Sequence, residues 1–294
     1  MKAINAGDLE IAYHEYGPSD GSPVILLHGF PYDARSFDRV SDILAQKGMR
    51  CLVPYLRGYG PTRFLSDDTM RSGQQAALAH DLLAFMDALA IPNAILGGYE
   101  WGGRAACIVA ALWPSRASGL VSCGRGYNIQ DIPNAWRPAP AAEEARYWYM
   151  YYFNTRRGEV ALKQNRSELC HHIWQIWSPT WSFDQATFDR TAQSFENPDF
   201  VDVVVHSYRH RFGDIDGDPR FDETEAKLAT QPDISVPTVV MLGGDDGVDP
   251  PSIEDFDRPH FTSDYRRIVR KGIGHNFPQE APEPFVDAVL SLLK

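Results

Sequence analysis

Cysteine is scarce in this chain, with only four among 294 residues. No two of them lie at the spacing of a zinc motif, and their density is far below that of a disulfide-stabilised domain. We therefore expect reduced thiols in the core of a cytoplasmic protein. The four positions are Cys51, Cys107, Cys123 and Cys170.

Long apolar runs and an excess of positive charge are also missing. No stretch could span a bilayer, and the first ten residues, MKAINAGDLE, lack the apolar segment of a signal peptide. Lysine and arginine total 28 against 39 aspartates and glutamates, which gives a net charge of −11. Nucleic acid or an anionic membrane would repel such a chain, so we expect neither as a partner. His206 and His210 have helical spacing but no third ligand nearby, and we expect no metal and no cofactor.

Short apolar runs alternate with amphipathic segments over most of the chain. The run PVILLHGF (23–30) is unalternating and is cut off by glycine, which is typical of a parallel strand covered on both faces. Helical spacing follows at 36–48, and the alternation of strand and helix continues to residue 127. It returns after residue 236. This rhythm predicts an α/β fold with a mostly parallel, doubly wound sheet.

The middle of the chain breaks this rhythm. Residues 128–232, called the cap segment below, are rich in aromatic side chains and lack short apolar strands. We interpret them as a helical cap inserted into one sheet domain, whose two parts are residues 1–127 and 233–294.

Side chains that can act as nucleophiles, acids or bases follow several of the predicted strands. Ligands of open α/β sheets bind beyond the carboxyl ends of the strands, where these loops lie. Glu100 stands in GGYEWGG (97–103), Asp246 in GGDDGVDPP (243–251) and His275 in GIGHNFPQEAP (272–282). A glycine-framed residue on a strand-to-helix turn is the usual position of a hydrolase nucleophile, and the chain order matches nucleophile, acid, base.

These motifs carry a family resemblance. The sequence resembles the α/β-hydrolase superfamily and, within it, the epoxide hydrolase and haloalkane dehalogenase group. HGFP (28–31) is similar to the group's oxyanion-hole motif, PYLRGYGPT (54–62) to its P-x-x-x-G-Y-G segment, and GGYEWGG to its nucleophile elbow. The elbow of that group normally carries aspartate, whereas this chain has Glu100.

The resemblance implies a role for each core residue. The Glu100 carboxylate would attack an epoxide carbon, and His275, oriented by Asp246 in preference to Asp245 or Asp249, would activate water against the resulting ester. The backbone N–H groups of Phe30 and Trp101 would form the oxyanion hole.

The resemblance also implies roles within the cap segment. Epoxide hydrolases use two cap tyrosines to hold and protonate the epoxide oxygen, and YMYYF (149–153) and SYRHRF (207–212) map these to Tyr149 and Tyr208. Trp101, Trp174 and Trp177 are expected to contact the substrate, which we expect to be a small apolar epoxide or halogenated compound.

The glutamate at the elbow leaves alternatives open. The longer side chain could still be the nucleophile, could act as a base toward water, or could mark a site that binds without turnover. Haloalkane or haloacid dehalogenation is the runner-up activity, because Trp101 occupies the position of a halide-binding indole in that group. A homodimer is a further alternative that the sequence leaves open.

Overall fold

The computed structural model describes residues 1–293 and contains a nine-stranded sheet. Its order is β1-β2-β4-β3-β6-β7-β8-β9, and the short strand β5 pairs with the start of β2 on the same side as β4. β1, β2 and β5 run antiparallel to their neighbours, and the strands from β4 to β9 pair in parallel. The strands are β1 Lys2–Ala6, β2 Leu9–Tyr16, β3 Ser22–Leu27, β4 Met49–Pro54, β5 Arg63–Phe64, β6 Ala94–Tyr99, β7 Ala117–Cys123, β8 Thr238–Gly243 and β9 Tyr265–Arg270.

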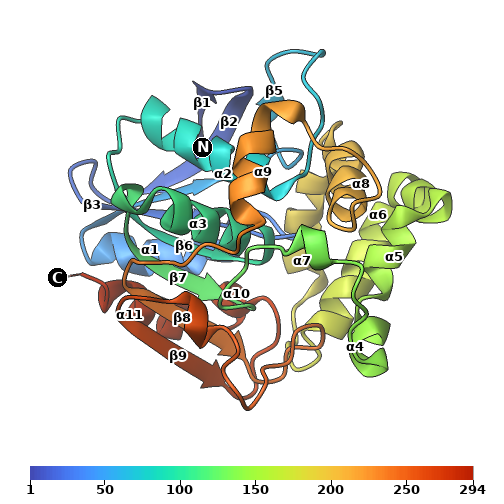
Figure 1. The fold of residues 1–294 in the computed structure, drawn as a ribbon. Helices are drawn as coiled ribbons and strands as arrows, with labels where there is room; N and C mark the ends of the chain where they lie inside the picture. Colours follow the sequence, from blue (N-terminus) through green and yellow to red (C-terminus); the bar gives the residue numbers. More distant parts are fainter. Residues whose placement is uncertain (294) are drawn as a thin grey trace.

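Helices cover both faces of the sheet (Figure 1). α1 and α11 contact each other on one face, and α2 and α3 contact each other on the opposite face. This double covering explains the continuous apolar runs, since every residue of β6 and β8 is buried. The helices are α1 Asp38–Gln46, α2 Gln75–Ala88, α3 Glu100–Leu112, α4 Ala141–Arg146, α5 Trp148–Asn154, α6 Arg156–Trp177, α7 Gln185–Ala192, α8 Phe200–His210, α9 Asp222–Leu228, α10 Phe277–Glu280 and α11 Pro282–Leu290.

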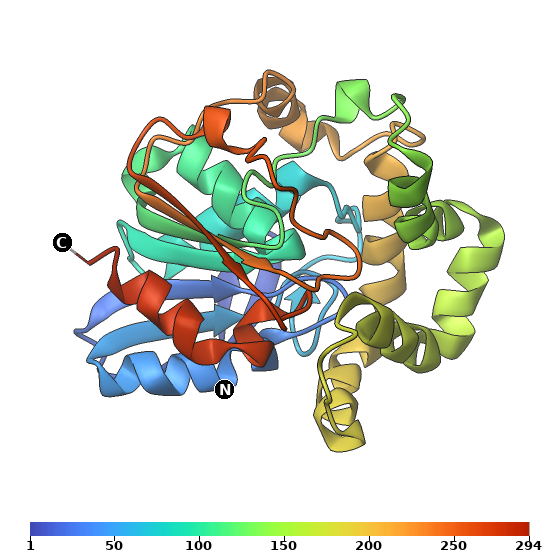
Figure 2. The same ribbon diagram turned by 90° about the horizontal axis from the view of Figure 1, so that it is seen from below.

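The cap segment supplies helices α4 to α9, and several of them gather at one end of the sheet (Figure 2). α5 packs against both α6 and α8 there. The long helix α6 begins at a capped turn, because the Thr155 hydroxyl accepts a hydrogen bond from the Gly158 N–H at 3.0 Å. The fold class is confirmed, while the division at residues 127 and 232 stays a prediction.

The pairing of strands positions the candidate residues. β3 and β6 are parallel, with Leu27 opposite Gly98, so the loops that follow both strands begin at the same sheet edge. β8 and β9 continue that edge, and the loops with Asp246 and His275 follow them. No helix within residues 1–293 is both long and apolar enough to cross a membrane. All four cysteines are buried and free.

Candidate active site

The turn between β6 and α3 holds Glu100 in a backbone conformation that side chains rarely adopt. Its φ is +52°, in the left-handed region, which costs about 1 kcal/mol or more in a non-glycine residue. The flanking glycines allow the tight approach of helix to strand. A Cβ on Gly102 would lie 2.1 Å from the Leu27 carbonyl oxygen, and one on Gly98 would lie 2.6 Å from the Gly102 carbonyl. The elbow predicted from GGYEWGG therefore places the carboxylate at the amino end of α3.

One carboxylate oxygen of Glu100 is held by two backbone donors. The Trp101 N–H donates to Oε2 at 2.7 Å, and the Phe30 N–H donates to the same oxygen at 3.3 Å. These are the two N–H groups expected to form an oxyanion hole. Within residues 1–293, Oε1 accepts no hydrogen bond, and Glu100 lines a cavity. The arrangement fixes one oxygen and leaves the other facing the space where a ligand would bind.

The loops after β8 and β9 bring an imidazole and a carboxylate together. Nδ1 of His275 lies 2.7 Å from Oδ2 of Asp246, while Oδ1 of Asp246 accepts from the N–H groups of Val248 and Asp249 at 2.9 Å each. Burial alone would lower the pKa of His275, but the adjacent Asp246, then Asp249 and Glu100, raise it to about 9. Nε2 of His275 is buried without a hydrogen-bond partner among the described residues.

The other two aspartates of this loop are engaged elsewhere. Asp245 accepts a hydrogen bond from the Gly272 N–H. Asp249 accepts from the Tyr147 hydroxyl at 2.7 Å and pairs with Arg125 at 3.1 Å. Asp246 is thus the aspartate whose carboxylate meets the imidazole.

Both loops close onto the last turn of α6. The Trp177 carbonyl accepts from the N–H groups of Gly247 at 2.9 Å and His275 at 3.2 Å. The Ser178 hydroxyl accepts from the His275 N–H at 3.0 Å and donates to Glu280 at 2.6 Å. The cap segment therefore shares backbone hydrogen bonds with the acid loop and the base loop.

The two predicted cap tyrosines lie side by side above the elbow. The rings of Tyr149 and Tyr208 have centroids 5.5 Å apart at an angle of 88°, and both are almost fully buried. Burial raises the pKa of both phenols well above 10, and the charge of Glu100 raises both further. Both hydroxyls therefore stay protonated at neutral pH. The Tyr208 hydroxyl has no hydrogen-bond partner within residues 1–293.

The three predicted tryptophans have different surroundings. Trp174 donates its indole N–H to the Pro31 carbonyl at 2.7 Å and stacks on Tyr32, with centroids 4.8 Å apart. It supports the loop after β3 and does not line the cavity. Trp177 packs between Tyr149 and His275, at 4.9 Å from each ring, and Trp101 lies 6.1 Å from Tyr208. The indole N–H groups of Trp101 and Trp177 have no partner among the described residues.

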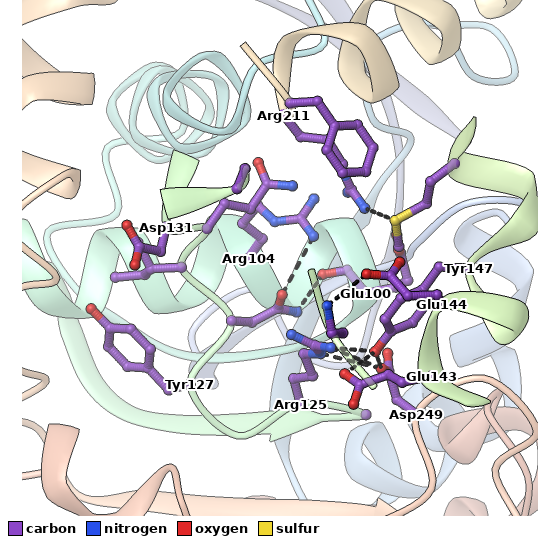
Figure 3. A pocket seen from close by; sticks show the side chains of 18 of the residues that line it. Glu100, Arg104, Arg125, Tyr127, Asp131, Glu143, Glu144, Tyr147, Arg211 and Asp249 are labelled. Carbon is purple, nitrogen blue, oxygen red and sulfur yellow. Dashed lines mark hydrogen bonds and ion pairs between the residues drawn. The ribbon is translucent and has the colours of Figure 1, made fainter. Parts of the chain in front are cut away.

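A cavity of about 440 Å³ opens beside these groups (Figure 3). Glu100, His275 and Tyr149 line it, whereas none of the three tryptophans does. Charged residues that we had not assigned to the site also line it, and Figure 3 labels all of them except Arg137. These residues are Arg104, Arg125, Arg137, Arg211, Asp131, Glu143, Glu144 and Asp249. Residues 1–293 contain no cluster of His, Cys, Asp or Glu that could hold a metal ion.

A signal for part of this charged lining is present in the sequence. Tyr208 and Arg211 stand three residues apart in SYRHRF, so they share one face of α8, and Arg211 lies with its guanidinium 4.7 Å from the Tyr208 ring. Tyr147 also lines the cavity, but its hydroxyl donates to Asp249.

A model of the alpha/beta hydrolase fold family matches residues 22–282, which include the elbow and both loops of the acid and the base. The chain belongs to this family. Within this family it is similar over 99% of its length to a crystal structure of a provisionally assigned epoxide hydrolase from Klebsiella pneumoniae. The identity is 46%, the TM-score is 0.97, and 96% of that chain is covered.

Two further relatives, both epoxide hydrolases, match this chain at lower identity. Epoxide hydrolase A of Mycobacterium tuberculosis is 23% identical, and the alignment covers 99% of this chain and 96% of that protein. An epoxide hydrolase of Caballeronia sordidicola is 31% identical over 106 residues, which span 36% of this chain and only 32% of that protein. The predicted likeness to epoxide hydrolases is confirmed.

Proposed function

We propose that this protein hydrolyses epoxides to vicinal diols, with Glu100 as the nucleophile. The observation that carries the proposal is the pair of hydrogen bonds from Trp101 N–H and Phe30 N–H to Oε2 of Glu100. An oxyanion hole that already holds one carboxylate oxygen is positioned for the ester carbonyl and the tetrahedral intermediate that follow attack by the other oxygen. The same arrangement disfavours Glu100 as a base toward water, since the deacylation base His275 lies beside it.

In the first half-reaction, Oε1 of Glu100 forms a bond to one epoxide carbon as the carbon–oxygen bond of the ring breaks. The ring oxygen leaves with the electron pair and takes a proton from the hydroxyl of Tyr149 or Tyr208. Both phenols are buried and protonated, and both lie within the electrostatic influence of Glu100. The product of this step is an alkyl ester of Glu100.

In the second half-reaction, Nε2 of His275 removes a proton from water, and the hydroxide adds to Cδ of Glu100. The negative charge then develops on Oε2, which the two backbone N–H groups stabilise. Collapse breaks the bond between Cδ and Oε1, and the departing alkoxide takes the proton from the imidazolium. The proton that remains on the carboxylic acid of Glu100 returns to the tyrosine phenolate, which restores the starting charges. The diol therefore keeps the oxygen that came from Glu100.

A single turnover in water enriched in ¹⁸O tests this route, with enzyme in excess over styrene oxide. We expect an unlabelled diol and one labelled oxygen in the peptide that contains Glu100, both read by mass spectrometry. Label in the diol of the first turnover would overturn Glu100 as the nucleophile and favour direct attack by water.

Hydrolysis of a carbon–halogen bond is a second candidate. It is favoured by the indole N–H groups of Trp101 and Trp177, which are buried and unpartnered and could donate to a departing halide. Measuring halide release from chlorinated and brominated alkanes against diol formation from epoxides separates the two functions.

A further inference from the structure

One inner wall of the cavity holds a buried guanidinium that forms no ion pair within residues 1–293, although the charge of Glu100 acts on it. Arg104 is only 5% exposed, and its Nε has no hydrogen-bond partner among the described residues. Its one hydrogen bond runs from Nη2 to Oδ1 of Asn128 at 3.5 Å, and no carboxylate within residues 1–293 forms an ion pair with it. Burial, and secondly the charge of Arg211, lower the pKa of Arg104 to about 10, so the group is still charged at neutral pH.

Arg211 is the second cation on this wall. It lies at the end of α8, donates from Nη1 to the Met150 sulfur at 3.1 Å, and covers the ring of Tyr208. With the side-chain amide of Gln130 oriented to accept, Nε and Nη2 of Arg211 each lie 2.9 Å from its oxygen. No carboxylate within residues 1–293 pairs with Arg211 either. Two like charges therefore line the cavity with only neutral hydrogen-bond partners.

Glu100 is the lining carboxylate whose charge acts on Arg104, while the other lining carboxylates accept hydrogen bonds from other groups; Glu143 accepts one from the Tyr147 hydroxyl at 3.3 Å. Asp249 is bound by Arg125 and Tyr147, and Glu144 accepts from the Ala139 N–H at 2.6 Å and from the Tyr151 hydroxyl. Asp131 accepts from the side-chain amide of Asn134 at 2.8 Å. Figure 3 shows Arg104 and Arg211 apart from the group formed by Asp249, Arg125 and Tyr147.

We propose that the substrate is an epoxide that carries a carboxylate, and that Arg104 and Arg211 bind this carboxylate. The inference rests on the proposed function and replaces the expectation of a purely apolar substrate. A planar carboxylate matches the donor geometry of a guanidinium, and it would satisfy the buried charge that the protein leaves unpaired. A dianionic group fits less well, because Asp131, Glu143 and Glu144 line the same cavity.

The position of Arg104 limits where the carboxylate sits on the substrate. Arg104 follows Glu100 by four residues at the start of α3, and both side chains line the same cavity closely enough for the charge of Glu100 to act on Arg104. The acid group is therefore only a few bonds from the ring carbon that Glu100 attacks.

Direct binding tests the carboxylate site without any turnover. By isothermal titration calorimetry we expect 3-phenylpropanoate to bind at least about tenfold more tightly than 3-phenylpropanamide, because only the acid pairs with the guanidinium groups. Arg104→Met and Arg211→Met should each remove this preference, and Arg104→Lys should retain part of it. Equal binding of acid and amide by the wild-type protein, or an unchanged preference in both Met variants, would overturn the proposal. So would a phosphonate of equal length that binds more tightly than the carboxylate.

Arg137→Met is the matched control. Arg137 lines the same cavity, but it is exposed at the rim beside Trp136, so the same loss of charge is screened by solvent. We expect the preference for the acid to change less than about threefold in this variant. Thermal unfolding of every variant identifies any that fails to fold, and Arg104→Lys then supplies the result for that position.

Kinetics separate this inference from the proposed function. We expect kcat/KM for 3-phenylglycidate to exceed that for its primary amide at least about tenfold, mainly through KM, and Arg104→Met to abolish the difference. Equal turnover of acid and amide, unaffected by Arg104→Met, would overturn the carboxylate site and leave epoxide hydrolysis intact. Arginine-dependent binding of the acid without turnover of either epoxide would overturn epoxide hydrolysis and leave the carboxylate site intact.

Discussion

The floor and the roof of the cavity are built in different ways. The floor comprises the loops after strands β3, β6, β8 and β9, and its reactive groups are held by hydrogen bonds of 2.7 to 3.3 Å to backbone N–H groups or to an oppositely charged side chain. The roof comprises the cap segment, and its rings are held by contacts between aromatic faces and edges. Both parts keep buried polar atoms without a partner among the described residues: Nε2 of His275 and the Trp101 indole N–H in the floor, and the Tyr208 hydroxyl and the Trp177 indole N–H in the roof.

This difference separates two tasks. Contacts between aromatic rings fix position less strictly than hydrogen bonds to the backbone, so the roof can adapt its shape to different ligands. The floor is organised before the ligand arrives and can carry the covalent chemistry. We therefore expect substitutions in the floor to remove turnover and substitutions in the roof to change which substrates react.

The largest effect is expected from Glu100→Gln in the floor. The amide keeps the shape of the side chain but is a far weaker nucleophile, so diol formation should fall by about 10³-fold or more. Glu143→Gln makes the same change at another position of the cavity wall and should stay within about threefold of the wild type. Retention of more than a tenth of the activity by Glu100→Gln would place the chemistry elsewhere.

A smaller effect is expected from the roof. Tyr149→Phe and Tyr208→Phe should each lower kcat for epoxides by about 10- to 100-fold, and together by about 10²- to 10⁴-fold, because a proton donor to the alkoxide is lost. Tyr152→Phe, in the same helix as Tyr149, serves as the control. A double variant with undiminished epoxide turnover would show that the roof only encloses the substrate, and halide release should then be measured.

The next largest effect is expected from pH, acting on the hydrolysis of the ester intermediate. His275 acts as a base only when neutral, and its pKa of about 9 leaves about 1% neutral at pH 7 in the free protein. Esterification removes the negative charge of Glu100, one of the groups that raise this pKa, so the pKa must fall in the intermediate. Single-turnover hydrolysis should accelerate with rising pH and level off below pH 9. A rate independent of pH between 6 and 9 would contradict His275 as the base.

The smallest effect is expected where floor and roof join, at Ser178. Ser178→Ala removes the acceptor of the His275 N–H and the donor to Glu280, so the free energy of unfolding should fall by about 1 to 3 kcal/mol. Urea unfolding measures this loss. Ser252→Ala, which alters an exposed hydroxyl, should change it by less than about 0.5 kcal/mol. Equal losses for the two variants would show that the junction carries no special stability.

The floor was predictable from the sequence and the roof only partly so. Glu100, Asp246 and His275 follow strands of one sheet, and parallel pairing brings strand ends together wherever the intervening chain goes. Trp174 and Trp177 belong to one helix and were both expected at the substrate, yet only Trp177 packs against His275. Which side of α6 faces the base depends on how the cap segment docks, and local spacing does not determine that.

The two cationic side chains of the cavity illustrate the same limit. Arg104 stands next to the elbow in the sequence, but its lack of a carboxylate partner emerges only once residues 125 to 131 and α8 are folded around it. Whether a buried arginine forms an ion pair depends on which residues the fold brings next to it, and the sequence around the arginine does not show this.

The shared carbonyl of Trp177 has a consequence for how molecules enter and leave. Because the loops of Asp246 and His275 both donate to that one atom, the end of α6 cannot swing outward without pulling on both loops and moving His275 relative to Glu100. A hinge at the end of α6 would therefore disrupt the arrangement of His275 and Glu100 each time it opened. Substrate and product should instead pass between α4 and residues 125–139, which border the cavity and carry none of the proposed catalytic side chains.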